Sequence, residues 1–87
     1  MSRPLTERDW SAEIVTIFRE ALDIELPSTR VDVIDTGILD SLALVTLLFE
    51  IEQRTGLQVP FERLELDDLR TVDDMAGAVG RLFEQAA

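Results

Sequence analysis

The tripeptide Asp40-Ser41-Leu42 is the part of this sequence whose residue types could do chemistry. Ser41 offers a hydroxyl, and Asp40 places a carboxylate directly before it. The 87-residue chain contains no histidine and no cysteine, so it cannot form a Ser-His-Asp or Cys-His arrangement that activates a nucleophile. The same absences remove the usual zinc ligands and all disulfides. We therefore do not expect this chain to catalyse a reaction by itself.

Other interpretations of the tripeptide follow from its spacing. Asp or Ser before an apolar run is what any helix start prefers, so helix capping alone explains the tripeptide taken in isolation. A nucleophile elbow needs glycine two residues before the serine, and Gly37 does not fit that position. A calcium loop that began at Asp32 would put Ile34 and Ala43 where oxygen ligands belong. The elbow and the calcium loop are discarded, and capping remains open at this point.

The N-terminal part of the chain predicts a helix and then a long loop. We expect the helix from about Thr6, as its cap, to Leu22, because apolar residues recur there at the spacing of one helix face. The loop from Asp23 to Asp40 contains Pro27 and Gly37, and loops of this length inside a compact domain are usually functional. Its apolar residues should pack on the helices, and a short strand over Val31–Ile34 would lack an obvious partner.

Two further helices are predicted after the loop. One should run from Ser41 to Thr55 and end at Gly56, which suits the residue just past a helix end. The other should run from Val72 to about Gln85, with Thr71 as its N-cap. Between them, the apolar residues from Leu57 to Arg70 predict one short helix or turn that lies across the bundle.

These elements and their motifs resemble the acyl and peptidyl carrier protein family. The resemblance rests on Gly37-Ile38-Leu39-Asp40-Ser41-Leu42, a following helix with Val45 and Glu52, Gly56-Leu57-Gln58-Val59-Pro60, and Thr71-Val72. It covers nearly the whole chain, residues 1–87, as a single domain. It implies an all-α fold, a small four-helix bundle with three main helices and one short helix.

The resemblance also implies a prosthetic group. In the family, a serine receives 4′-phosphopantetheine from coenzyme A through a magnesium-dependent phosphopantetheinyl transferase, and Ser41 matches that serine. Asp40 matches the acid before it and would face basic residues of the transferase. An exposed hydroxyl at a helix start need not be acidic when the modifying enzyme supplies the base. The reactive thiol belongs to the cofactor, so the chain is expected to be a carrier and not an enzyme.

The helix from Ser41 to Thr55 is apolar on two sides. At about 100° per residue, one arc holds Leu44, Leu47, Leu48 and Ile51 and must be core. A second arc on the side of Ser41 holds Leu42, Val45 and Phe49, and from the sequence alone it could be core too. Partner enzymes of the family dock on this helix, so the resemblance implies that Asp40, Leu42, Val45, Phe49 and Glu52 contact partners. Ala43 and Thr46 stand where fatty-acid carriers often have acids, which favours apolar docking.

The composition limits the kinds of molecule that this chain is expected to bind. The hydrophobic fraction of 46% favours a folded domain, and the net charge of −10 should repel nucleic acid and anionic membrane surfaces. The acidity should attract basic protein surfaces, although it could equally serve solubility alone. No signal sequence is evident, and the apolar stretch Leu42–Ile51 is too short to span a bilayer. We expect a cytoplasmic monomer that binds neither nucleic acid nor membrane.

The sequence leaves several functions open. The first is a free-standing acyl or aminoacyl carrier of a polyketide, nonribosomal peptide or other specialised pathway, served by a loading enzyme, acyltransferase or synthase. A fatty-acid carrier is the alternative, although the segment from Pro60 to Thr71 is slightly long for one. A noncatalytic interaction module that retains the fold is another, against which the intact Asp40-Ser41-Leu42 counts. A small acidic enzyme is disfavoured because the chain has no His, Cys or Lys.

Overall fold

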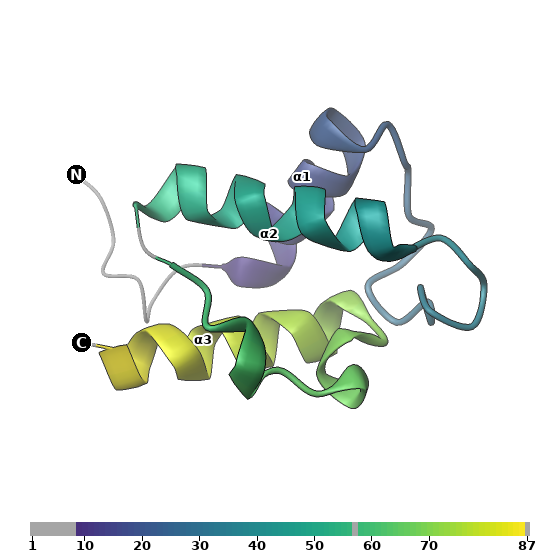
Figure 1. Cartoon of the computed structure of the whole chain (residues 1–87). Coiled ribbons are helices and arrows are strands. Elements are labelled where there is room, and N and C mark those ends of the chain that lie inside the picture. The colour runs from purple at the N-terminus through teal and green to yellow at the C-terminus, as the bar shows by residue number, and fades with distance from the viewer. Residues whose placement is uncertain (1–8, 57, 87) are drawn as a thin grey trace.

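The computed structural model describes residues 9–56 and 58–86 and contains only helices and loops in these ranges. The order is α1 (Trp10–Ala21), α2 (Ser41–Thr55), η2 (Phe61–Arg63), η3 (Leu66–Leu69) and α3 (Val72–Ala86), where η marks short 3₁₀ helices. In Figure 1, α2 and α3 cross the view one above the other, and α1 passes behind α2. The prediction of an all-α fold is confirmed for the described residues.

α1 begins later than the sequence predicted. Asp9 is its N-cap, and the Asp9 carboxylate accepts a hydrogen bond of 3.1 Å from the Ala12 N–H. The predicted cap, Thr6, lies outside the described residues. α1 ends at Ala21, after which Asp23 takes a left-handed conformation with φ of 55°. This bend lets the Ile24 N–H donate to the Phe18 carbonyl at 2.8 Å, so the chain folds back against the end of the helix.

The predicted boundaries of the other two helices hold closely. α2 spans Ser41–Thr55, and Gly56 closes it in the left-handed region with φ of 73°. α3 starts at Val72, and the Thr71 hydroxyl accepts from the Asp74 N–H at 3.0 Å, as expected of an N-cap.

The fourth, short helix is two 3₁₀ helices instead of one continuous element. Glu65 separates them, because its N–H donates to the Asp68 carboxylate at 2.9 Å and its carbonyl accepts from the Asp68 N–H at 2.9 Å. A new helical turn therefore starts at Leu66. Leu69 at its end is buried and anchors η3 to the core.

No strand forms over residues 31–34. The Asp32 carboxylate accepts from the Ile34 N–H at 3.0 Å and the Asp35 N–H at 2.9 Å, which bends the backbone into a turn. Such a local bond from an Asp side chain competes with extended structure. Gly37 ends the turn with φ of 75°.

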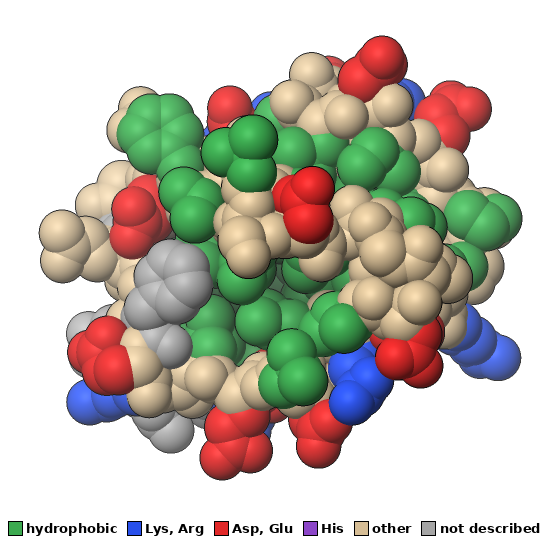
Figure 2. All heavy atoms as spheres, turned by 45° about the vertical axis from the view of Figure 1, so that its right-hand side comes forward, with side chains coloured by type: hydrophobic (Ala, Val, Ile, Leu, Met, Phe, Trp, Pro, Cys, Tyr) green, Lys and Arg blue, Asp and Glu red, His purple; other side chains and the backbone are tan. Residues whose placement is uncertain are grey.

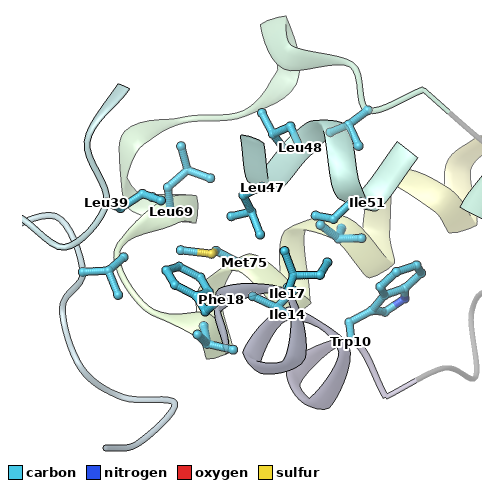
Figure 3. Packing of buried hydrophobic residues seen from close by; sticks show 14 of the residues in the cluster. Trp10, Ile14, Ile17, Phe18, Leu39, Leu47, Leu48, Ile51, Leu69 and Met75 are labelled. Atoms are coloured by element: carbon cyan, nitrogen blue, oxygen red, sulfur yellow. The ribbon is translucent and has the colours of Figure 1, made fainter. Parts of the chain in front are cut away.

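One hydrophobic core joins the three helices, as Figure 3 shows. α1 contributes Ile14, Ile17 and Phe18, which meet Leu47 and Ile51 of α2. Met75 and Val72 enter from α3, and the Trp10 and Phe83 rings pack with their centroids 5.1 Å apart. From the long loop, Val33 and Leu39 are buried. The core therefore fixes both ends of the loop segment that leads into α2.

Candidate functional site

Ser41 is the first residue of α2, and its side chain is exposed. Asp40 caps the helix, because its carboxylate accepts from the Ala43 N–H at 2.8 Å. No described residue forms a hydrogen bond with the Ser41 hydroxyl. The sequence predicted both the helix start and the exposure. A serine in this position offers its oxygen to an enzyme without first breaking a contact within the fold.

The turn before Ser41 is tied to Arg70, which lies between η3 and α3. The Val33 N–H donates to the Arg70 carbonyl at 2.7 Å, and the Leu39 N–H donates to the Val33 carbonyl at 2.8 Å. Leu39 directly precedes Asp40. Two backbone hydrogen bonds therefore link Arg70 through Val33 to Leu39, the residue before Asp40.

Arg70 also binds the turn through its side chain. Its guanidinium lies 3.4 Å from the Asp32 carboxylate, 3.6 Å from that of Asp35 and 2.8 Å from that of Asp67. Arg70 was not among the residues predicted from the sequence, since it is 38 positions from Asp32 and no local spacing connects them. Only its place beside the Thr71 cap could have drawn attention to it.

Asp32 in the turn and Arg70 stabilise each other's charged forms. Hydrogen bonds to the carboxylate, that of the Asp35 N–H first and that of the Ile34 N–H after it, hold the pKa of Asp32 below its ordinary value, and the charge of Arg70 adds to them. The hydrogen bond to Asp67 and the charge of Asp32 raise the pKa of Arg70. The ionised form of Asp32 is therefore the form that holds the turn.

We expect Asp32→Asn to lower the stability of the protein at neutral pH and to lose that effect in acid. A carboxyl whose pKa is lower in the folded protein adds stability above its unfolded pKa, and this stability disappears as the pH falls through the folded pKa. The difference between the two melting temperatures should therefore begin to shrink as the pH falls below about 3.8, the ordinary pKa, and should disappear only below the lower pKa of the folded protein. Thermal unfolding followed by circular dichroism from pH 7 to pH 2.5 measures this.

The exposed Glu62 provides the control, because Glu62→Gln removes one negative charge from η2, away from this turn. A difference between the parent and Asp32→Asn that grows in acid would contradict the assigned role of Asp32.

The second apolar arc of α2 faces outward. Leu42, Val45 and Phe49 are 76%, 55% and 56% exposed, whereas their neighbours Leu47 and Leu48 are buried. Figure 2 shows one face of the molecule on which hydrophobic side chains gather among scattered carboxylates. Leu66 of η3 is a further exposed large apolar residue among the described residues. The three α2 residues are therefore not core. Contiguous exposed apolar side chains of this kind mark surfaces that bind other molecules.

Glu52 stabilises the fold through a hydrogen bond within the chain. Its carboxylate accepts from the Val59 N–H at 2.8 Å and so ties α2 to the segment before η2. A contact between Glu52 and a partner stays a prediction, as do the partner roles of Asp40, Leu42, Val45 and Phe49.

Comparison with known proteins identifies a family that matches most of this chain. Residues 12–79 match the family described as a phosphopantetheine attachment site. The D-alanyl carrier protein of Streptococcus sanguinis is 34% identical over 76 residues, which cover 85% of this chain and 95% of that protein. The D-alanyl carrier protein of Listeria monocytogenes is 39% identical over 49 residues, 56% of this chain and 63% of that protein. The chain thus spans less than two thirds of the Listeria protein and nearly all of the streptococcal one.

Proposed function

Because the chain belongs to the family of carrier proteins with a covalently attached 4′-phosphopantetheine, we propose that Ser41 bears this group. Members of this family carry substrates and are not catalysts. The observation that supports Ser41 most directly is its place at the start of α2, exposed and without a hydrogen-bond partner among the described residues. When attached, the arm supplies a thiol that holds an acyl group as a thioester.

The surroundings of Ser41 suit the attachment. A bond forms between the Ser41 oxygen and the phosphorus of the incoming group, the bond from that phosphorus to the rest of coenzyme A breaks, and the hydroxyl proton leaves to a base of the transferase. The N–H groups at the start of α2 favour a negative charge there. The Asp40 carboxylate opposes it, so the phosphodiester should point into water. Nothing in this chain has to move a proton.

The cargo we propose is a small aminoacyl group. The similarity to D-alanyl carrier proteins, which extends over 95% of the streptococcal relative, supports an amino acid more than a fatty acyl chain. A carrier for a polyketide or nonribosomal peptide pathway is the second candidate. The exposed Leu42, Val45 and Phe49 favour apolar docking of the partner in either case. Phosphopantetheinyl transferases and loading enzymes are the general partners of such carriers.

A loading assay tests the cargo. The protein is first converted with coenzyme A and a broad-specificity phosphopantetheinyl transferase. It is then incubated with ATP, an aminoacyl-adenylating enzyme of the same organism and a panel of small amino acids that includes both enantiomers of alanine. We expect the intact mass to rise by one aminoacyl group, and hydroxylamine, which cleaves thioesters, should remove it. A second incubation supplies malonyl or long-chain acyl groups with their own loading enzymes. Loading there, with no amino acid loaded in the first incubation, would overturn the aminoacyl proposal and leave the carrier role intact.

A further inference from the structure

A groove of about 380 Å³ lies beside Ser41, between the end of α1 and the first turns of α2. Asp40 and Leu42, the two chain neighbours of Ser41, both line it. The other lining residues come from the end of α1, the two ends of the long loop and α2: Ala21, Leu22, Ile24, Ile38, Ala43 and Thr46. Apart from Asp40 and Thr46 the lining is apolar, and most of it is half-buried. The groove is therefore an apolar hollow that a partner could fill.

Local structure keeps the groove open and apolar. The left-handed bend at Asp23 turns Ile24 back to form one wall. On the α2 side, Ala43 has a side chain too small to fill the space. The Thr46 hydroxyl donates to the Leu42 carbonyl at 3.0 Å, so its hydrogen is satisfied within the helix. An acidic side chain at either of these α2 positions would project charge into the hollow.

The charge around the groove indicates what could enter it. Asp40 is the only charged residue in the lining, and exposed Asp23 follows Leu22 directly. Leu42 at its edge is largely in water. An apolar side chain with a neighbouring Lys or Arg would bury the lining and pair with Asp40, whereas an acidic or purely polar segment would do neither.

We propose that this groove receives an apolar anchor side chain, flanked by a basic residue, from the phosphopantetheinyl transferase that acts on Ser41. The inference rests on the proposed function and adds a second contact to the exposed face of α2. An enzyme that reaches the Ser41 hydroxyl must lie over Asp40 and Leu42, which also form the groove. Ala43 and Thr46 then determine specificity, because they leave the groove open to an apolar anchor.

Thr46→Phe tests the proposal by filling the groove. Thr16→Phe is the matched control, because Thr16 in α1 also donates its hydroxyl to the carbonyl four residues earlier, at 2.9 Å, and does not line the groove. We expect Thr46→Phe to raise the KM of the transferase for the carrier about tenfold with kcat little changed, as loss of an interface anchor does. Thr16→Phe should keep the KM of the parent. The melting temperatures of the two variants are measured as well, to check that both proteins are folded.

A second measurement needs no variant. Titration of the unmodified parent with the transferase should shift or broaden the methyl NMR signals of Ile38 in the groove and leave those of Val15, which lies outside it, unchanged. An unchanged Ile38 signal together with an unchanged KM for Thr46→Phe would overturn the proposal. Ile38 signals that respond to attachment of the arm and not to the transferase would overturn it as well, in favour of the arm as occupant. A parent that is not modified at Ser41 would instead refute the proposed function.

Discussion

Leu48→Ala is expected to remove roughly 2–5 kcal/mol from the free energy of unfolding. Leu48 is 4% exposed and belongs to the core that joins the helices, so truncation leaves a cavity there. A domain of this size holds only about 4–13 kcal/mol in total. The variant should therefore unfold at a much lower denaturant concentration than the parent, or fail to fold. Urea unfolding of the unmodified protein, followed by circular dichroism, measures the difference.

Phe49→Ala is the matched comparison, one residue further along α2. Its ring is 56% exposed on the outer face, so we expect a stability change of no more than about 1 kcal/mol. It should instead weaken transfer to or from a partner enzyme by about tenfold or more, since aromatic residues that become buried in an interface dominate its energy. A Phe49→Ala protein as unstable as Leu48→Ala would show that the outer face is part of the core, and the docking surface would have to lie elsewhere.

The contrast between Leu48 and Phe49 also indicates what the sequence could predict. Helical periodicity separated the two arcs of α2, and the structure buries Leu47, Leu48 and Ile51 as predicted. Leu44, which was also predicted to be core, is only half-buried and packs against the edge of the core. Periodicity alone also allowed the outer arc to be core. The resemblance to carrier proteins was the reason to predict that this arc is exposed. The C-terminal end of α2 was predictable because Gly56 there adopts a left-handed conformation that other residues disfavour.

Long-range contacts were not predictable from the sequence. Nothing near Asp32 indicates that Arg70, 38 residues later, binds it, or that Glu52 accepts a hydrogen bond from the Val59 backbone instead of facing only solvent. The break between η2 and η3 is set by hydrogen bonds between Glu65 and Asp68, which apolar spacing does not encode. The groove beside Ser41 likewise arises from segments that meet only after the loop has folded back.

Ser41→Ala should abolish attachment of phosphopantetheine, because the new bond forms at the Ser41 oxygen and alanine has none. The fold should be retained, since Asp40 and not Ser41 caps α2 and the serine side chain is exposed. Circular dichroism of the variant checks this. Ser11→Ala and Ser28→Ala are the controls, and both should be modified at the rate of the parent. Neither serine starts a helix after an aspartate.

Mass spectrometry of the intact parent after incubation with coenzyme A and a broad-specificity phosphopantetheinyl transferase, followed by peptide mapping, tests the role of Ser41 most directly. We predict a single added phosphopantetheine on the peptide that contains Ser41 and an unchanged mass for Ser41→Ala. An added phosphopantetheine on the Ser41→Ala protein, or on a peptide without Ser41, would contradict attachment at this serine.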